Sequence, residues 1–114
     1  MTSGEARYAD LYGRLLRCWP VETGRHWRAE NPAPGQCSVT ALVVRDVLGG
    51  EILKTEVNGA GHFYNAIGGR RVDFTASQFA GPIGYDDSPS DRAEALADTT
   101  PDYYRLLRKR VTTA

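Results

Sequence analysis

The chain of 114 residues has the size of a single domain, large enough for one hydrophobic core and too small for two. Its 14 basic and 14 acidic side chains cancel, so it lacks the broad positive charge that draws proteins onto nucleic acids or anionic membranes. No apolar run approaches the ~18 residues that span a bilayer, and the polar N-terminus lacks a signal-peptide core. We therefore expect a cytoplasmic protein with a small-molecule or peptide-like substrate and no nucleic-acid or membrane partner; the sequence leaves its oligomeric state open.

The first predicted element is an amphipathic helix over about residues 5–18. Its apolar side chains recur at helical spacing until Pro20 interrupts the pattern. They are Tyr8, Leu11, Tyr12, Leu15, Cys18 and Trp19. Cys18 lies on this stripe, so we interpret it as a buried core residue rather than as half of a disulfide with Cys37. The next segment, 20–36, holds three prolines and two glycines and is predicted to be a long loop.

A central helix is predicted to begin at Cys37. The run over 38–48 is rich in β-branched residues, which favours a strand. Its length, and the Gly49-Gly50 pair that follows it, favour instead a helix that is buried on most of its surface.

Three strand-like segments follow, over 51–57, 62–67 and 70–74, joined by a loop at 58–61 and by the turn Gly68-Gly69. They predict a small antiparallel sheet. A short helix over 91–97 and a C-terminal helix over about 101–110, capped by Thr100, complete the pattern. The prediction is one compact α+β domain over 1–114, with an N-terminal helix, a central helix opened by the cysteine, a small antiparallel sheet and a C-terminal helix.

The parity of the last hairpin brings two functional side chains to one face of the sheet. If Gly68 and Gly69 form the whole turn, Asp73 stands opposite Tyr64, and His62 lies diagonal to Asp73. A carboxylate at that distance can bind one imidazole nitrogen. If a helix packs across this face with its N-terminus near His62, the other nitrogen meets the sulfur of Cys37.

This order of residues predicts a nucleophile, a base and an orienting group. A helix N-terminus beside an imidazolium favours the reactive thiolate form of a cysteine. His62 would stabilise the thiolate and protonate the leaving group, while Asp73 would hold the ring in one tautomer. The backbone N–H of Cys37 points to where an oxyanion would form. The candidates for a second oxyanion donor or a substrate contact are Gln36, Asn31, Trp27, Tyr64 and Gln78.

Each residue also has an ordinary structural explanation. Cys37 alone is typical of core packing, His62 of a bond to a loop carbonyl, and Asp73 of a solvated pair with Arg70 or Arg71. Metal binding by Cys37, His62 and Asp73 together with His26 is a further alternative. The chain lacks the closely spaced ligand pair that usually anchors zinc, so we expect no metal and no other cofactor.

Several blocks of the sequence resemble the YunG-like family of small bacterial proteins. They are NP…GQC…TALVV between Asn31 and Val44, GGEILKT at 49–55, HFYNAI at 62–67 and VDFT…QF at 72–79. The similarity covers about residues 27–111. The order Cys, His, Asp in turn resembles the transglutaminase-like and papain-like superfamily, in which a cysteine opens a helix and His and Asp lie on adjacent antiparallel strands.

The resemblance implies Cys37 as nucleophile, His62 as base and Asp73 as orienting group. We expect a cysteine-dependent hydrolase or acyltransferase that acts on an amide or thioester through an acyl-cysteine intermediate. The alternative hypothesis is a binding or interaction module with the same fold and a blocked or incomplete site, since a fold by itself does not establish a reaction.

Overall fold

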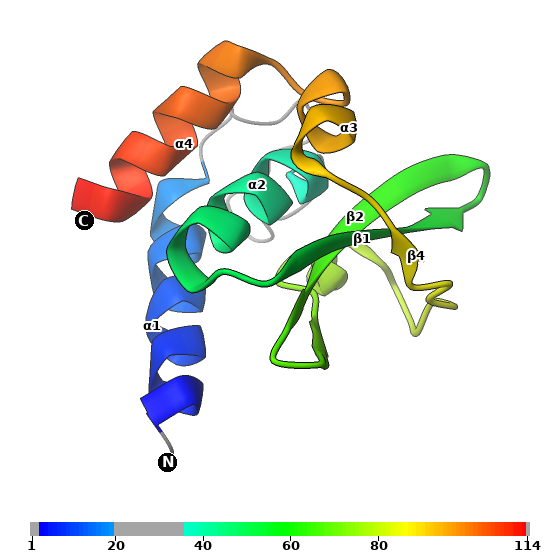
Figure 1. Ribbon diagram of the computed structural model, residues 1–114, viewed down its shortest axis with the longest axis horizontal. Helices are drawn as coiled ribbons and strands as arrows, with labels where there is room; N and C mark the ends of the chain where they lie inside the picture. The colour runs from blue at the N-terminus through cyan, green and yellow to red at the C-terminus, as the bar shows by residue number, and fades with distance from the viewer. Residues whose placement is uncertain (1–2, 20–35, 114) are drawn as a thin grey trace.

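The computed structural model of the chain describes residues 3–19 and 36–113. Its elements are α1 (Ser3–Cys18), α2 (Cys37–Leu48), β1 (Glu51–Val57), β2 (Ala60–Ile67), β3 (Arg70–Val72), the 3-10 helix η2 (Ala76–Gln78), β4 (Ser88–Pro89), α3 (Arg92–Ala97) and α4 (Pro101–Thr113). The described part is thus α+β, as predicted, with four α-helices and an antiparallel sheet in the order β3-β2-β1-β4 (Figure 1).

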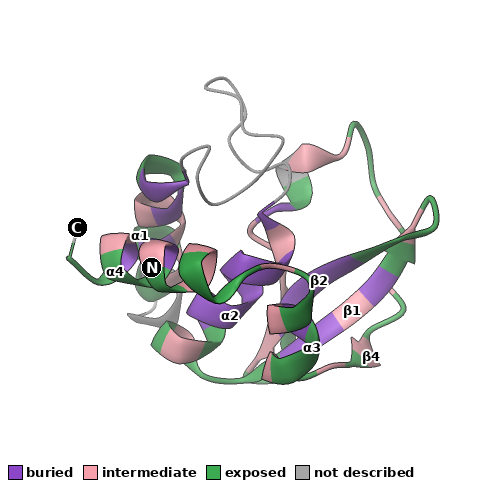
Figure 2. Ribbon diagram, turned by 90° about the horizontal axis from the view of Figure 1, so that it is seen from above, coloured by how far each residue is buried: buried purple, intermediate pink, exposed green. Residues whose placement is uncertain are grey.

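Helix α2 lies between the sheet and the pair formed by α1 and α4 (Figure 1). All its residues from Ser38 to Val44 are buried, and Figure 2 shows them as a continuous buried stretch. A helix covered on every side has no polar face, which explains why its sequence lacks an amphipathic period. The prediction of a helix here, against the β-branched composition, is confirmed.

The hydrophobic core falls on the two sides of α2. One cluster joins α2 to α1 and α4, and the other joins α2 to the sheet and α3. The first contains Leu11, Leu15, Cys18, Trp19, Val39, Val43, Val44, Leu107 and Val111. The second contains Ala41, Leu42, Ile52, Phe63 and Ala95. Cys18 is a buried core residue, as predicted, and neither cysteine forms a disulfide.

The hairpin of β2 and β3 has the predicted register, since Ile67 pairs with Arg70 and Asn65 with Val72. The third strand nevertheless ends at Val72 rather than at residue 74. Oδ1 of Asp73 accepts hydrogen bonds from the backbone N–H of Thr75 at 3.1 Å and from its Oγ1 at 3.2 Å. These local bonds replace strand pairing and turn the chain into η2.

The hairpin of β1 and β2 is tighter than predicted. Val57 pairs with Ala60, so only Asn58 and Gly59 form the turn, with φ angles of 53° and 82°. An Asn-Gly pair readily adopts positive φ angles in a two-residue hairpin turn. The loop expected over 58–61 is therefore wrong, and β2 begins at Ala60 instead of His62.

Helix α2 covers the face of the sheet opposite to the predicted one. Asn65 Nδ2 donates to the carbonyl of Ala41 at 3.0 Å, and Phe63 packs against the same helix. Because side chains alternate along a strand, His62 and Tyr64 project from the opposite face. The prediction that the helix packs across the His62 face is wrong, since this parity directs His62 away from α2.

The chain between β3 and β4 covers that second face. Phe79 contacts the ring of His62 edge-on, and Tyr85 contacts the ring of Tyr64 in the same manner. The segment then forms β4, which pairs with β1 at Leu53 and Lys54. Two residues carry no periodic pattern, so the sequence gives no sign of this fourth strand.

The two C-terminal helices begin where the sequence places them. Asp91 caps α3 by accepting from the backbone N–H of Glu94 at 2.8 Å, and Thr100 Oγ1 accepts from that of Tyr103 at 3.1 Å. This confirms the predicted N-terminal cap of α4, which extends beyond residue 110 to Thr113. Among residues 3–19 and 36–113, none of the helices has the length and apolar character needed to cross a bilayer.

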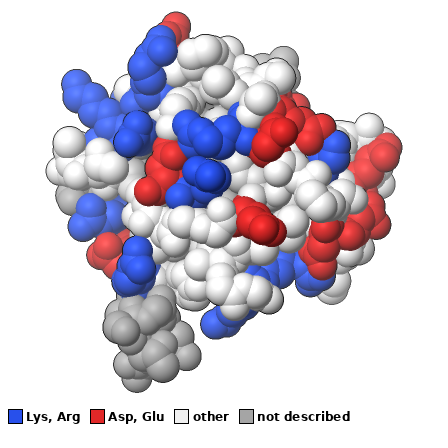
Figure 3. All heavy atoms as spheres, viewed as in Figure 1, with Lys and Arg blue, Asp and Glu red and all other residues white. Residues whose placement is uncertain are grey.

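Polar contacts join helices α2, α3 and α4. Asp46 of α2 accepts from Arg92 of α3 at 2.5 Å and from the Tyr104 hydroxyl of α4, and Arg108 lies 3.8 Å away. Basic and acidic side chains are interspersed across the middle of the face seen in Figure 3. The positive and negative charges that balance in the sequence are therefore not separated in the middle of this face.

Candidate active site

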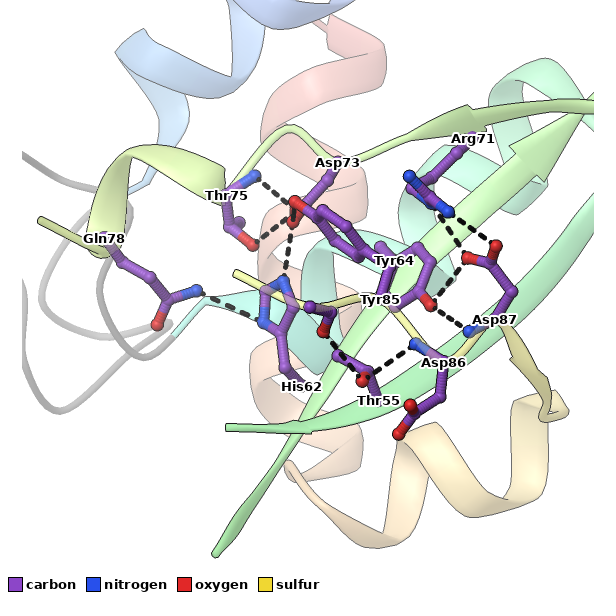
Figure 4. Close-up of polar contacts among 11 residues, drawn as sticks. Thr55, His62, Tyr64, Arg71, Asp73, Thr75, Gln78, Tyr85, Asp86 and Asp87 are labelled. Atoms are coloured by element: carbon purple, nitrogen blue, oxygen red, sulfur yellow. Dashed lines mark hydrogen bonds and ion pairs between the residues drawn. The ribbon is translucent and has the colours of Figure 1, made fainter. Parts of the chain in front are cut away.

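His62 and Asp73 form a buried pair at the centre of the site (Figure 4). Nε2 of His62, on β2, lies 2.7 Å from Oδ2 of Asp73, just beyond β3. Their side chains are only 3% and 6% exposed. The diagonal contact predicted from the hairpin parity is thus present in the structure.

Asp73 accepts hydrogen bonds from three residues. Oδ2 binds His62 and the hydroxyl of Tyr85, at 2.8 Å, while Oδ1 binds the backbone N–H and the hydroxyl of Thr75. Burial alone would raise the pKa of Asp73, but the hydrogen bonds and charge of His62, with those of Tyr85 and Thr75, outweigh it and hold the pKa below its usual value. Asp73 is therefore an ionised acceptor at neutral pH.

The simpler explanation of Asp73, a solvated pair with a neighbouring arginine, does not describe this carboxylate. Arg71 binds the carboxylate of Asp87 instead, with Nε at 2.8 Å and Nη2 at 2.6 Å. Asp73 points toward the interior and His62, as Figure 4 shows.

Cys37 is the first residue of α2 and is partly exposed. The side chain of the residue before it, Gln36, makes no capping bond to the first turn. The leading N–H groups of a helix have no partner within the helix. The thiol of Cys37 therefore lies at the N-terminus of a helix, close to backbone N–H groups that have no partner within that helix.

Cys37 also interacts directly with His62. Burial opposes protonation of the imidazole, but hydrogen bonds to Asp73 and Cys37 and the charges of these two groups outweigh it and raise the pKa of His62 to about 9. His62 is therefore an imidazolium at neutral pH. With Nε2 bound to Asp73, Nδ1 remains for the sulfur.

A short third strand makes this contact compatible with the position of α2. Strand β3 pairs only with residues 65–67 of β2, so no described strand flanks His62 on that side. The N-terminus of α2 can therefore meet His62 at the strand edge, although the helix packs on the other face of the sheet.

Gln78, one of the predicted substrate-binding candidates, lies beside the ring of His62. Its Nε2 lies 3.5 Å from Nδ1 of His62, and the residue is partly exposed (Figure 4). Its amide thus lies beside the ring nitrogen that remains for Cys37.

The other candidates are placed differently. Tyr64 stacks on His62 with ring centroids 5.9 Å apart, but its hydroxyl donates to Oδ1 of Asp87 at 2.8 Å. Burial, with the Asp87 hydrogen bond, raises the pKa of Tyr64 to about 12. Gln36 is fully buried. Trp27 and Asn31 lie outside the described residues, as does His26 of the metal alternative. Within the described ranges, no three His, Cys, Asp or Glu side chains are arranged to hold a metal ion.

Comparison with known proteins places the chain in a family. The model of the YunG protein family matches residues 7–114. The chain belongs to the YunG family. It is 46% identical over 95 residues to a Bacillus subtilis (strain 168) protein named "Uncharacterized protein YunG", and the match covers 83% of each chain. No solved structure matches the chain, so the transglutaminase-like and papain-like arrangement stays a prediction.

In this YunG-family protein, the sequence analysis missed the residues that support Asp73. Thr75 had a local signal, because Asp followed two residues later by Thr is typical of a side-chain turn. Tyr85 had none, since it lies 12 residues from Asp73 in a segment rich in Gly, Pro and Asp. Thr55 is also part of this support: it stands opposite His62 in the register and binds the segment that carries Tyr85.

Proposed function

We propose that this YunG-family protein is a cysteine-dependent acyl-transfer enzyme in which Cys37, His62 and Asp73 form a catalytic triad. One observation carries the proposal: a buried His62–Asp73 pair, 2.7 Å apart, lies beside a cysteine that opens a helix. The charge of Asp73 and the raised pKa of His62 favour an imidazolium beside the sulfur of Cys37, which is the partner that a cysteine nucleophile needs. We extend the proposal to a papain-like or transglutaminase-like core in a cytoplasmic protein.

In the first half of the reaction, the thiolate of Cys37 attacks the carbonyl carbon of an amide or thioester. A C–S bond forms and the carbonyl electrons move to oxygen, where the backbone N–H of Cys37 and the side-chain amide of Gln78 are candidate donors. The oxyanion then collapses, the bond to the leaving amine or thiol breaks, and the imidazolium of His62 gives that group its proton.

In the second half, water or an amine attacks the acyl-cysteine. Neutral His62 takes a proton from the attacking group, the C–S bond breaks, and Cys37 leaves as thiolate beside the restored imidazolium. Asp73 keeps Nε2 bound throughout and so orients Nδ1 toward the reaction. The proton that His62 gives to the leaving group is replaced by the proton of the attacking water or amine, so the triad returns to its starting state, and a small molecule or peptide with an amide or thioester supplies the acyl group.

The pH dependence of thiol alkylation tests the proposal, with Cys18 as internal control. Iodoacetamide modification of each cysteine is followed by peptide mass spectrometry in the wild type and in His62→Ala and Cys37→Ser variants. Cys18 is buried, and burial raises the pKa of its thiol, so it should react slowly. We expect Cys37 to react at least ~10-fold faster than Cys18 at about pH 7, and to react ~10-fold more slowly in His62→Ala than in the wild type.

A second reading of the same site is a binding module, and the deep burial of His62 and Asp73 favours it. The two functions differ in covalent chemistry. With p-nitrophenyl acetate, an enzyme should retain one acetyl group on Cys37, detectable in the intact mass and absent from Cys37→Ser. If Cys37 reacts as an ordinary thiol, independently of His62, and takes up no acetyl group, the acyl-transfer proposal is wrong and the binding module is favoured.

A further inference from the structure

Tyr85 binds the same oxygen of Asp73 as His62 does. Its hydroxyl donates to Oδ2 at 2.8 Å, while Nε2 of His62 lies 2.7 Å from that atom. The two donors come from different elements, β2 and the segment before β4, and meet at one carboxylate oxygen (Figure 4). The Asp73 oxygen that binds His62, the proposed base, therefore also binds Tyr85.

The ring of Tyr85 is fixed by two neighbours. The guanidinium of Arg71 lies 4.4 Å from the ring centroid, and the ring of Tyr64 contacts it at 4.9 Å with planes inclined by 73°. Asp87 locks both of these neighbours. It binds Arg71 through two carboxylate oxygens and accepts from the hydroxyl of Tyr64 at 2.8 Å.

The backbone on either side of Tyr85 is anchored as well. Thr55 Oγ1 donates to the carbonyl of Gly84 at 3.1 Å and accepts from the N–H of Asp86 at 3.0 Å. Thr55 is buried and stands opposite His62 on the neighbouring strand. A tyrosine held by its ring and by both flanking residues has little freedom to move its hydroxyl away from Asp73.

We propose that Tyr85 is a positioning residue which, by sharing Oδ2 of Asp73 with His62, limits how tightly the carboxylate holds the imidazole. The proposal rests on the proposed function in treating His62 as the base. A hydroxyl hydrogen on Oδ2 withdraws negative charge from that oxygen and places a positive partial charge near the imidazolium. Both effects weaken the hold of Asp73 on a protonated ring.

The other groups around this contact leave Tyr85 able to act as a donor. The charged or titratable groups facing its hydroxyl are Asp73, Arg71 and Tyr64, and those facing His62 are Asp73, Cys37 and the stacked ring of Tyr64. Burial and the hydrogen bond to Asp73 raise the pKa of Tyr85 to about 12, so it remains protonated while His62 titrates. General acid–base catalysis is most effective when the pKa of the catalytic group lies near the working pH, so moderating the hold of Asp73 favours turnover.

The test is the titration of His62 by NMR in the wild type and in Tyr85→Phe. The chain has two histidines, and a His62→Gln spectrum identifies the signal. Phe keeps the ring contacts with Arg71 and Tyr64 and removes only the hydroxyl. We expect the titration midpoint of His62 to move to higher pH by about half a pH unit or more, because Oδ2 of Asp73 then binds the imidazolium alone.

The matched control is Tyr104→Phe. Tyr104 also donates its hydroxyl to a carboxylate, that of Asp46, which lies nine positions along α2 from Cys37, or about 14 Å. This variant should leave the midpoint of His62 unchanged. An unchanged or lowered midpoint in Tyr85→Phe would overturn the proposal, since a merely structural role for Tyr85 predicts loss of the Asp73 contact and a lower midpoint.

A second measurement keeps the outcome clear if Tyr85→Phe loosens the fold. The carboxyl carbon of Asp73 should titrate at higher pH in the variant, because its charged form has lost a donor, while near-ultraviolet circular dichroism reports the packing. Both titrations are independent of catalysis. If Cys37 proves inert while the midpoint of His62 rises, the role of Tyr85 stands and acyl transfer fails; if Cys37 is reactive and the midpoint does not rise, the reverse holds.

Discussion

The carboxylate of Asp73 shows how a buried charge is stabilised by a small number of residues. An isolated ionised group in the interior is costly unless it is paired and hydrogen-bonded. Asp73 meets both conditions through His62, Tyr85 and Thr75. Removing one of these partners should therefore destabilise the folded state, because it leaves the buried charge of Asp73 less compensated.

The His62–Asp73 pair makes the stability of the fold depend on pH. Since the pKa of His62 is raised from 6.5 to about 9, its contribution is fully present below pH 6.5 and is lost as the pH rises through about 9. The pKa of Asp73 is lowered from 3.8, so its contribution is present above that value and disappears as the pH falls through the folded-state pKa. Between these limits both groups stabilise the folded state.

We expect the free energy of unfolding of the wild type to fall more steeply than that of His62→Gln between about pH 6 and pH 10. Urea unfolding followed by circular dichroism at several pH values measures both curves. The variant corrects for every other group that titrates in this range. Two curves that run parallel would show that the raised pKa of His62 does not contribute to stability.

At the scale of elements, the junction between α2 and β1 fixes how the central helix meets the sheet. Gly49 and Gly50 both have positive φ angles, 78° and 80°. A Cβ on Gly50 would lie 2.2 Å from the carbonyl oxygen of Ala66, whereas one on Gly49 would meet nothing within 4 Å. The two neighbours share the backbone requirement, and only Gly50 lies against the neighbouring strand.

This difference predicts unequal costs for the same substitution. Gly49→Ala should destabilise the protein by about 1–2 kcal/mol, through backbone strain alone. Gly50→Ala should cost at least ~2 kcal/mol more, because the backbone of β2 must also move. Chemical denaturation of the two variants measures the difference. Equal losses would mean that the junction accommodates a side chain and that close packing does not require Gly50.

At the scale of the whole molecule, the fold has three layers, with α1 and α4 on one side of α2 and the sheet on the other (Figures 1 and 2). The segment between β3 and β4 adds a cover on the outer face of the sheet, and this cover carries Tyr85. The proposed site lies where the N-terminus of α2, the edge of β2 and the cover meet. Its geometry therefore depends on the packing of all the layers.

A single substitution in α4 tests whether this helix packs against α2 as part of the hydrophobic core. Leu107 of α4 is fully buried in the cluster shared with α1 and α2, so Leu107→Ala should cost about 3 kcal/mol through lost burial and a residual cavity. Leu16 of α1 is 41% exposed, and Leu16→Ala should cost less than about 1 kcal/mol. Thermal unfolding compares them. Similar losses would indicate that α4 does not pack as a core layer.

The sequence by itself determined the features that depend on neighbours along the chain. The helical spacing from Leu11 to Cys18, the cap at Thr100 and the Gly68-Gly69 turn rest on local geometry. The parity of that turn was enough to bring His62 and Asp73 together, because one register fixes every side chain on both strands. Family membership also follows from the sequence, as the match over residues 7–114 shows.

Tertiary structure decided what depends on segments far apart in the chain. Which face of the sheet α2 covers is set by packing at Phe63 and Asn65, for which strand alternation offers two equal choices. Strand β3 ends at Val72 because local bonds to Asp73 compete with strand pairing. The pairing of β4 with β1 and the contact of Tyr85 with Asp73 join segments that are separated by long loops. Such contacts join residues far apart in the chain, so no periodicity in the sequence predicts them.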